Sequence, residues 1–335
     1  MQNKKVTLKL LAEYLGMSTA AVSKALNDKP DISQETIARV KKTARRFGYS
    51  PNIIARSLVS RRSFMIGVVV PDLRISFFSE IARGIYETAR NDNYIPILMV
   101  HDESQELEEK NLEFLSSLPV DGILLCGSPG AGNMELIRKI LNQNIPIVSY
   151  DRIIPDLDIS SIAIKDFEAT IRLVEFLKSS GREKIAFIGP NDKPWVCIER
   201  YRGYKHAIKK LKLGIGDEYF MYSKLDEIDS ENAYNKFMER NLPVNAVICP
   251  GGLVALGVGK ALIRKGIRIP EDIILSEFGN NNVVSKLGVP FISVDQSPYE
   301  MGQQAFKMLI EEIDNSDTDR KKVYIDTTII QNPVI

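Results

Sequence analysis

Hydrophobic residues recur at helical spacing in three short segments near the start of the chain. The apolar positions are Leu8, Leu11, Ala12 and Leu15 in the first segment, Val22 and Leu26 in the second, and Ile37, Val40, Ala44 and Phe47 in the third. Gly16 suits a tight exit from the first helix, and Ser18 and Ser33 stand where a hydroxyl can cap the next two. The pattern predicts three short helices in residues 1–50.

From Phe64 onward, the pattern changes to alternating strands and helices. Short apolar runs predict strands at 66–70, 95–100, 122–126, 145–150, 185–188, 246–249, 273–278 and 323–330. Helical spacing predicts helices at 77–90, 106–118, 136–143, 167–179, 199–210, 233–239, 256–265 and 301–313. Repeated units of this length imply parallel sheets covered by helices on both faces. Because these strands are too many for one sheet, we expect two similar α/β lobes with a cleft between them.

Residues 49–62, with the sequence YSPNIIARSLVSRR, join the three predicted helices, which we call the head, to the predicted α/β lobes, which we call the body. Their Ser-Pro-Asn segment is a helix-start signal, and an apolar stretch over residues 53–59 follows it. A helix of one or two turns is unstable alone in water, so we expect contacts outside this segment, including pairing with a second copy, to order it. The alternative is a plain linker, although plain linkers are seldom this apolar.

Length and composition are those of a two-lobed globular protein with a small head. The chain has 335 residues, 44% of them hydrophobic, and no apolar run long enough to span a bilayer. Its N-terminus has charge but no apolar core or cleavage site of a secretory signal. Cys126, Cys197 and Cys249 are widely spaced, so we interpret each as a buried thiol in a reducing cytoplasm rather than a disulfide partner, ligand or nucleophile.

Charge is divided unevenly along the chain. Residues 1–62 hold 13 lysines and arginines against 4 acidic residues, a net charge of +9, while the remaining residues hold 31 against 39, a net charge of −8. The overall charge of +1 therefore hides a basic head on an acidic body. Local positive charge neutralises phosphates, and an acidic body discourages the wrong face from binding DNA.

The second predicted helix has a small, polar outer face opposite its apolar one. That face holds Thr19, Ala20, Ser23, Lys24 and Asn27. Such a helix can lie in a major groove and read base edges. The third helix adds an outer row of cations, Arg39, Lys42, Arg45 and Arg46. An ordinary solvated amphipathic helix is the alternative, but three short helices with this charge pattern are typical of a helix-turn-helix unit.

Enzyme and cofactor chemistry find little support in the sequence. The glycine-rich segment 127–132 lacks the order G-x-G-x-x-G, and we interpret it as a cleft loop. His101 and His206 have no cysteine or carboxylate partners at metal-ligand spacing, and Ser149 has no local histidine for a triad. We therefore expect neither catalysis, nor a metal, nor a cofactor.

The head resembles the LacI/GalR family of bacterial transcription regulators. The resemblance lies in VTLKLLAEYLGMSTAAVSKALNDKPDISQETIARVKKTARRFGYSPNIIARSL, and the body agrees in IGVVVPDLRISFFSEIARGI, VDGILLCG, IPIVSYDR, REKIAFIG, ERYRGYKHAI, ALGVGKALIRKGIRIPEDI and SVDQSPYEMGQQAFKML. It implies an N-terminal all-α helix-turn-helix head, a hinge helix, and an α/β two-lobe body like the periplasmic binding proteins.

On this resemblance, the expected domains are a helix-turn-helix domain at 1–50, a hinge helix or linker at 51–62, and an effector-binding and dimerisation domain at 63–335. The family's body crosses between its lobes three times. We therefore expect one lobe at about 63–163 and 293–320, and the other at about 164–292 and 321–335.

The resemblance also implies DNA contacts, carried over position by position. Thr19, Ala20 and Lys24 should face bases in the major groove. Lys24 stands where members often have arginine, so it can donate to guanine but lacks the planar fork, and Ala20 can offer only a methyl contact. Phosphate contacts set register without specifying sequence, and the implied residues are Thr7, Ser18, Ser23, Asn27, Ser33, Thr36 and Tyr49.

In the hinge, Leu58 falls where the family inserts a leucine from each subunit at a central minor-groove step, with Asn52 and Ala55 flanking it. An apolar wedge of this kind unstacks the step and bends the DNA. Two heads on a twofold axis imply a homodimer and a pseudo-palindromic operator.

In a two-lobe α/β body, the ligand site is the cleft outside the carboxyl ends of the strands. Spacing and family position together indicate Phe77, Phe78, Asp151, Trp195, Arg200, Phe278 and Asn280 as effector-binding residues. The alternatives are core packing for the aromatic residues, a surface salt bridge for Arg200, and capping of loop N–H groups for Asp151. Arg200 matches the family's ligand-gripping arginine, and a guanidinium clamp suits vicinal hydroxyls, a carboxylate or a phosphate.

Two segments depart from the sugar-binding members. The sequence CPGG at 249–252 replaces their Asn-Asp, and EFGNN at 277–281 replaces their Gly-Phe/Tyr-Asp-Asp. Either the effector is not a simple neutral sugar, or Asn280, Asn281 and Asp151 accept its hydrogen bonds. A protein partner, or loss of small-molecule control, is also open.

These expectations converge on a cytoplasmic, homodimeric, sequence-specific DNA-binding regulator, expected to be a repressor. A sugar-like or anionic effector in the cleft would alter its affinity for the operator. The alternative is a cytoplasmic carbohydrate-binding or sensory protein without operator-specific binding. No membrane partner is expected.

Overall fold

The computed structural model describes residues 6–26, 28–49, 62–130, 132–154, 156–279, 282–315 and 319–333. The chain divides into two compact units, Met1–Ser63 and Phe64–Ile335, each with a hydrophobic core of its own. None of the helices in the described ranges is long and apolar enough to cross a bilayer.

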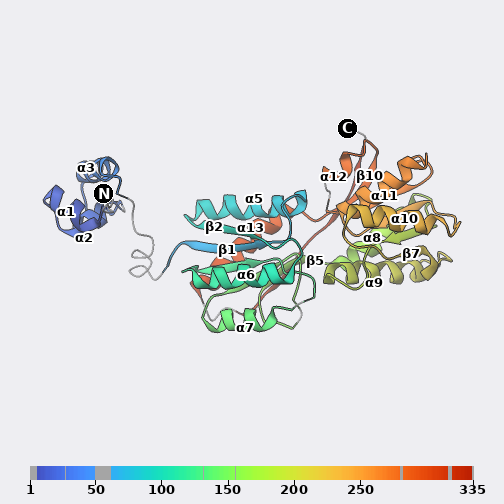
Figure 1. Ribbon diagram of the computed structural model, residues 1–335, viewed down its shortest axis with the longest axis horizontal. Coiled ribbons are helices and arrows are strands. Elements are labelled where there is room, and N and C mark those ends of the chain that lie inside the picture. The colour runs from blue at the N-terminus through green and yellow to red at the C-terminus, as the bar shows by residue number, and fades with distance from the viewer. Residues whose placement is uncertain are drawn as a thin grey trace. The chain divides into compact units, whose positions relative to one another are not determined.

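The described residues of the first unit form three helices, α1 (Leu8–Leu15), α2 (Thr19–Leu26) and α3 (Gln34–Arg46), which confirms the three helices predicted from the sequence (Figure 1). Gly16 ends α1 in the left-handed region, with a φ of 63° that a residue without a Cβ adopts at little cost. Leu11, Val22 and Val40 supply one fully buried residue from each helix, so the three helices share one small core.

The second unit contains two six-stranded sheets that lie side by side (Figure 1). The first sheet has the strand order β11-β5-β4-β3-β1-β2, and all of its neighbours are parallel. Its strands are β1 (Met65–Val70), β2 (Ile95–Val100), β3 (Gly122–Leu125), β4 (Ile147–Tyr150), β5 (Ser161–Ile164) and β11 (Lys322–Ile325).

The second sheet has the strand order β12-β10-β9-β8-β6-β7, and only β12 runs antiparallel to its neighbour. Its strands are β6 (Ile185–Ile188), β7 (Phe220–Met221), β8 (Ala246–Cys249), β9 (Ile274–Phe278), β10 (Phe291–Asp295) and β12 (Thr328–Asn332). Continuous burial along β6, β8 and β9 explains why these strands read as unbroken apolar runs.

Helices cover both faces of each sheet. The first sheet packs α5 (Ser76–Asn91) and α13 (Pro298–Asp314) on one face, and α6 (Gln105–Ser117) and α7 (Met134–Asn142) on the other. The second packs α8 (Asp166–Ser179) and α9 (Trp195–Lys210) on one face, and α10 (Glu227–Met238) and α11 (Gly252–Arg264) on the other. The fold is therefore a helical head unit and an α/β body of two lobes, as the sequence indicated.

Three details of the body differ from the sequence prediction. Strand β10 stays in the second sheet through Asp295, so the second crossing between lobes lies after this residue and not before Ser293. The predicted strand at 323–330 is two strands, because the chain breaks at Asp326-Thr327 and steps from the edge of the first sheet to the edge of the second. The predicted lobe boundary at 320/321 is therefore wrong, since β11 belongs to the first sheet.

Five short elements escaped prediction: β5, β7, β10, α12 (Asn282–Ser285) and the 3-10 helix η1 (Asp217–Tyr219). Each has five residues or fewer, which is too short to show a period of its own. The packing of longer neighbours, and not a local pattern, defines them.

Candidate functional site

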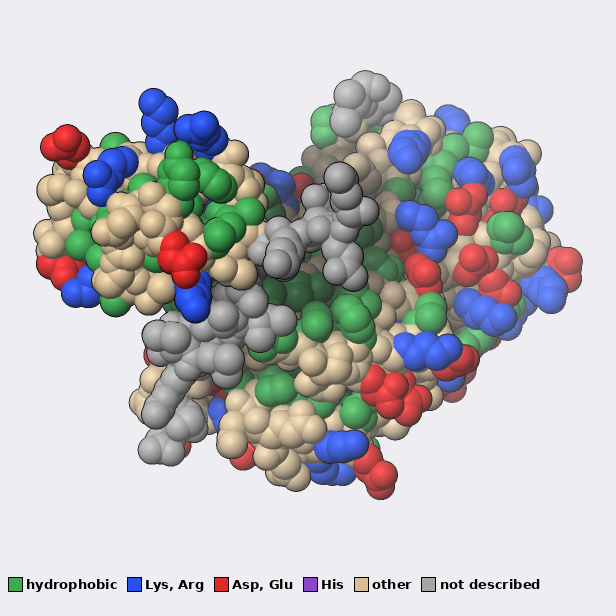
Figure 2. All heavy atoms as spheres, turned by 60° about the vertical axis from the view of Figure 1, so that its left-hand side comes forward, with side chains coloured by type: hydrophobic (Ala, Val, Ile, Leu, Met, Phe, Trp, Pro, Cys, Tyr) green, Lys and Arg blue, Asp and Glu red, His purple; other side chains and the backbone are tan. Residues whose placement is uncertain are grey.

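The second helix of the head presents the predicted base-reading residues to solvent. Thr19, Ala20 and Lys24 are exposed, whereas Val22 and Ala25 on the opposite face are fully buried. Basic side chains stand out from the surface of the same unit (Figure 2). Within its own unit, the outer face of α2 is therefore small, polar and open, as insertion into a major groove requires.

Several predicted phosphate-contact residues cap helices in the head. The hydroxyl groups of Thr7, Ser18 and Ser33 accept hydrogen bonds from the N–H group three residues later, at 3.3, 3.1 and 3.3 Å. The Thr36 hydroxyl lies 2.9 Å from that of Ser33. Caps of this kind fix the first turns of the helices, whose remaining N–H groups can donate to phosphate oxygens.

Burial raises the pKa of the half-buried Tyr49 phenol, which therefore stays protonated and can donate to a phosphate. Ser23 is half-buried. Asn27 and the predicted hinge residues Asn52, Ala55 and Leu58 lie outside the described residues.

Lys24 pairs with a carboxylate of its own unit. Its ammonium lies 2.5 Å from Asp31, in the turn before α3, and both side chains are 53% exposed. The hydrogen bond from Lys24 lowers the pKa of Asp31. Asp28, from the same turn, accepts two hydrogen bonds from Lys41. The cation expected to reach a base thus has an acidic neighbour with which DNA must compete.

In the body, a cavity of about 180 Å³ lies between the lobes at the carboxyl ends of the strands. We call it the central cavity. Five of the seven predicted effector residues line it: Phe77, Phe78, Asp151, Arg200 and Phe278. Trp195 lines an adjoining pocket of about 150 Å³, and Asn280 lies outside the described residues.

Arg200 is buried and makes three hydrogen bonds, which excludes the surface salt bridge considered from the sequence. Its Nε donates to Asp166 at 2.6 Å, its Nη1 to the Pro250 carbonyl at 2.6 Å and its Nη2 to Gln296 at 3.1 Å. Its guanidinium carbon stacks 4.3 Å from the centre of the Phe278 ring. Asp166 and Gln296 belong to two of the segments that cross between lobes, so Arg200 joins both crossings.

A second buried arginine, Arg152, was not among the predicted residues. Its Nη1 and Nη2 grip the two carboxylate oxygens of Glu103 at 2.7 and 2.6 Å, and its Nη1 also donates to the Gly127 carbonyl at 2.9 Å. Its guanidinium carbon lies 5.8 Å from the centre of the Phe78 ring. The one feature of the sequence that indicates Arg152 is its position next to Asp151, directly after a strand.

Two buried carboxyl groups in this region hold protons unusually well. Burial raises the pKa of Asp166 to about 7, even though the charge of Arg200 opposes the shift. Burial also raises the pKa of Asp151, against the attraction of Arg152 and Arg200. The Asp151 backbone has a φ of 61°, and its carboxylate accepts a long contact of 3.9 Å from the Cys126 thiol.

Carboxylates outnumber guanidinium groups around the central cavity. Five acidic residues line it, Asp72, Asp102, Glu103, Asp151 and Asp226, together with three arginines, Arg74, Arg152 and Arg200. Each guanidinium already pairs with a carboxylate, and the third of these pairs is Arg74 with Asp72 at 2.7 Å. The cavity thus has a surplus of hydrogen-bond acceptors.

Neither of the two segments that depart from the sugar-binding members adds a carboxylate to the cavity. Glu277 is fully buried in β9 and accepts a hydrogen bond from Ser293 at 2.6 Å. In the other segment, the Pro250 carbonyl is occupied by Arg200.

All three cysteines are buried free thiols, as predicted. Burial raises the pKa of each thiol, for Cys197 to about 12, so they stay protonated and unreactive. Across the described ranges, no three His, Cys, Asp or Glu side chains gather in a way that could hold a metal ion.

Two known protein families match the chain, one over the helical unit and one over the α/β body. The family described as "Bacterial regulatory proteins, lacI family" matches residues 7–52, and "Periplasmic binding proteins and sugar binding domain of LacI family" matches residues 63–333. The chain belongs to the LacI family. It is a DNA-binding transcriptional regulator with an effector-binding domain, from a family of regulators and not of enzymes.

Similar regulators cover nearly the whole chain. The HTH-type transcriptional repressor CytR of Escherichia coli (strain K12) is 30% identical over 315 residues, which are 93% of this chain and 91% of CytR. Catabolite control protein A of Priestia megaterium is 29% identical over 331 residues, 98% of this chain and 96% of that protein.

Two solved structures show the same fold. One is a Lac repressor dimer bound to operator and the anti-inducer ONPF, with a TM-score of 0.86, 20% identity and 99% coverage of both chains. The other is a complex of the transcriptional regulator CelR with cellobiose, with a TM-score of 0.73, 22% identity, and coverage of 98% of this chain and 100% of CelR.

Proposed function

We propose that this LacI-family regulator is a cytoplasmic repressor that binds a pseudo-palindromic operator as a homodimer. The observation that carries the proposal is the face of α2, on which Thr19, Ala20 and Lys24 are exposed opposite a fully buried face. The small side chains of Thr19 and Ala20 let the helix approach base edges closely, and Lys24 supplies one donor for guanine. The regulator acts on chromosomal DNA, so we place it in the cytoplasm.

The face for the second copy is the free edge of the first sheet. Edge strand β2 and the flanking helices α5 and α6 expose large apolar side chains: Tyr86, Ile95, Leu98, Leu107 and Phe114, each between 39% and 56% exposed. We call this set the β2 face. A long apolar edge strand left open invites pairing with another chain. A symmetric pair of copies would cover it on both subunits.

The effector we propose is uncharged and rich in hydroxyl or N–H groups. Each arginine of the central cavity is already paired with a carboxylate, whereas the carboxylates outnumber the arginines. An anion would therefore meet a surplus of negative charge, while donor groups would meet acceptors such as Asp151 and Asp102. The phenyl rings of Phe77, Phe78 and Phe278 provide apolar faces for a ring-shaped ligand.

Arg200 links the ligand cavity to the segments that cross between the lobes. It bonds Asp166 and Gln296, on two of the three segments that cross between lobes. A ligand that draws the guanidinium into the central cavity would weaken these bonds and change the angle between lobes. The coupling between effector and operator would then be about 1–3 kcal/mol, the usual allosteric scale.

Selection of bound sequences from a random duplex library tests operator recognition. We expect one enriched pseudo-palindrome, which footprinting should show as a protected site. Uniform, weak binding to all sequences would contradict the proposal and favour a sensory protein whose head does not read DNA.

A thermal-shift screen tests the class of effector. We expect neutral sugars or purines to raise the melting temperature, because they bring donors to a cavity rich in acceptors. Sugar phosphates and sugar acids serve as matched charged controls. Stabilisation by the charged ligands alone would overturn the assignment to an uncharged effector.

Replacing Asp31 by alanine should strengthen binding to the operator about two- to fivefold, and binding to unrelated duplexes less, because it frees Lys24, the proposed guanine donor, from an exposed ion pair. Fluorescence anisotropy at two salt concentrations measures the change. Asp28→Ala is the control, since it removes the same charge from the same turn but releases Lys41. Equal gains in both variants would show that net charge, and not the release of Lys24, is responsible.

A further inference from the structure

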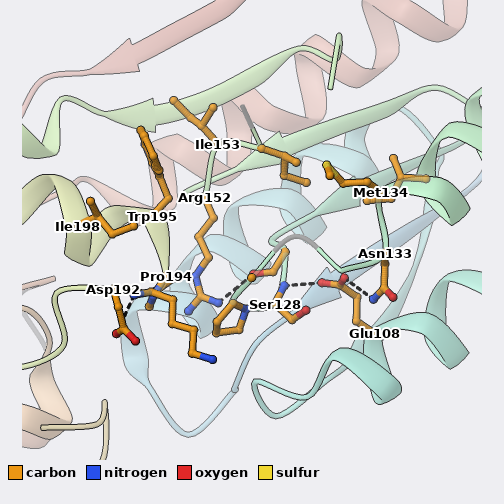
Figure 3. A pocket seen from close by; sticks show the side chains of 16 residues that line it. Glu108, Ser128, Asn133, Met134, Arg152, Ile153, Asp192, Pro194, Trp195 and Ile198 are labelled. Atoms are coloured by element: carbon orange, nitrogen blue, oxygen red, sulfur yellow. Dashed lines mark hydrogen bonds between the residues drawn. The ribbon is translucent and has the colours of Figure 1, made fainter. Parts of the chain in front are cut away.

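A second pocket adjoins the central cavity, and we call it the lateral pocket. It holds about 150 Å³ and lies between α7, the loop after β4 and the start of α9. In Figure 3, Trp195 and Ile198 stand on one side, Met134 and Asn133 on the other, and Arg152 and Ser128 between them. Arg152 and Pro194 line both this pocket and the central cavity, so the two spaces share a wall.

The walls of the lateral pocket are mainly apolar. The apolar residues are Pro129, Met134, Ile137, Ile153, Ile154, Pro194, Trp195 and Ile198. Trp195 is 40% exposed, which leaves much of its indole uncovered. An apolar cavity of about 150 Å³ is the size that accepts one benzene ring. The pocket therefore has the size and lining for a single aromatic ring.

One polar atom in this wall, the Ser128 hydroxyl, is buried without a hydrogen-bond partner in the described part of the chain, and its residue is 8% exposed. The Arg152 Nε also makes no hydrogen bond, but it lies 3.9 Å from the carboxylate of Asp151, which lines the central cavity. A buried donor without an acceptor is costly. A ligand that supplies a hydrogen-bond partner to Ser128 would remove that cost.

The loop that carries Ser128 is held in place. Its N–H donates to the Glu108 carboxylate, which also accepts a hydrogen bond from Asn133 at 2.7 Å. Arg152 is held by its grip on Glu103. Ser128 and the neighbouring guanidinium are thus fixed before any ligand arrives, which lowers the entropic cost of binding.

Charge around the lateral pocket is balanced. Glu108 and Asp192 line it together with Arg152 and Lys193, two charges of each sign. Because Glu108 and Arg152 are engaged with protein groups, neither a cation nor an anion finds an open counter-charge in the interior. An uncharged ring fits this environment best.

We propose that the lateral pocket binds an uncharged aromatic or heteroaromatic ring that carries a hydrogen-bond acceptor. The ring stacks on Trp195 and accepts a hydrogen bond from the Ser128 hydroxyl. The ring is one part of a two-part effector, whose polar part lies in the central cavity. Only this last statement rests on the proposed function.

The probe is benzamide, a neutral ring with a carbonyl acceptor, and Trp195 is the reporter because it is the only tryptophan in the chain. We expect a saturable change in tryptophan emission with benzamide and none with acetamide, which has the acceptor but no ring. Ser128→Ala should weaken benzamide binding about fivefold, the effect of one lost hydrogen bond. Ser149→Ala is the matched control, because its hydroxyl is also buried and unpaired among the described residues but lines neither space.

Linear, collisional quenching, or an equal response to acetamide, would overturn the proposal. So would equal weakening by Ser128→Ala and Ser149→Ala. The measurement uses the full chain without DNA. Benzamide binding by a protein that selects no operator would contradict the proposed function alone, and operator selection without benzamide binding would remove the lateral pocket alone.

Discussion

Replacing Leu98 by aspartate is expected to leave the protein monomeric and to weaken its binding to a palindromic operator by about 100-fold or more. Leu98 is 43% exposed on edge strand β2, in the middle of the β2 face. In a symmetric dimer the substitution would bury an unpaired carboxylate in each subunit, which costs several kcal/mol. Operator affinity falls when dimerisation is lost, because a monomer lacks the high effective concentration of the second head at its half-site.

Tyr324→Asp is the control for this experiment. Tyr324 is also 43% exposed and lies on β11, the opposite edge of the same sheet. Sedimentation gives the oligomeric state, and anisotropy with a full operator and a single half-site gives the affinity. Both variants should keep the wild-type free energy of unfolding per monomer, since neither residue belongs to the core. A Leu98→Asp protein that stays dimeric, or a Tyr324→Asp protein that also dissociates, would remove the β2 face as the dimer interface.

Local periodicity predicted the elements, because each apolar stripe lies within one helix or strand. The head shows this best: the spacing of Leu11, Val22 and Val40 places each on the buried face of its helix. Strand order could not be predicted in the same way, since it depends on partners far apart in the chain. Lys322 pairs with Ser161, and nothing near either residue indicates the other.

The cleft shows a similar limit. Family position located Arg200 and Asp151, but not the partners that determine what they can bind. Arg152 was not predicted because its importance depends on a bidentate contact with Glu103. Glu103 lies in a loop and has a left-handed φ of 59°. The sequence predicted Trp195 as an effector-binding residue of the cleft, and the structure places it in the wall of the lateral pocket and not of the central cavity.

Truncating Arg200 should strongly destabilise the body. At pH 8, Arg200→Ala is expected to lower the free energy of unfolding by about 3–5 kcal/mol, because it leaves a buried carboxylate without its partner. Arg202→Ala is the control: it removes an ion pair with Glu199 from the same helix, but its side chain is 60% exposed. That variant should lose about 1 kcal/mol or less.

The loss from Arg200→Ala should depend on pH with a definite sign. The pKa of Asp166 is raised to about 7, so between pH 4 and 7 the folded protein holds a proton that the unfolded chain releases. The contribution of Asp166 to stability is therefore present at low pH and declines as the pH rises through 7. Without Arg200 the folded-state pKa rises further, because an attractive charge is gone. The penalty should consequently be smaller at pH 5 than at pH 8.

Urea unfolding at both pH values measures the effect, and a double variant, Asp166→Asn with Arg200→Met, separates its causes. Replacing both partners of a buried ion pair leaves no orphaned charge, so most of the stability should return. A penalty equal at pH 5 and pH 8 would contradict the raised pKa of Asp166. A double variant as unstable as Arg200→Ala would show that the hydrogen bonds of Arg200 to Pro250 and Gln296, and not its pairing with Asp166, hold the crossing segments together.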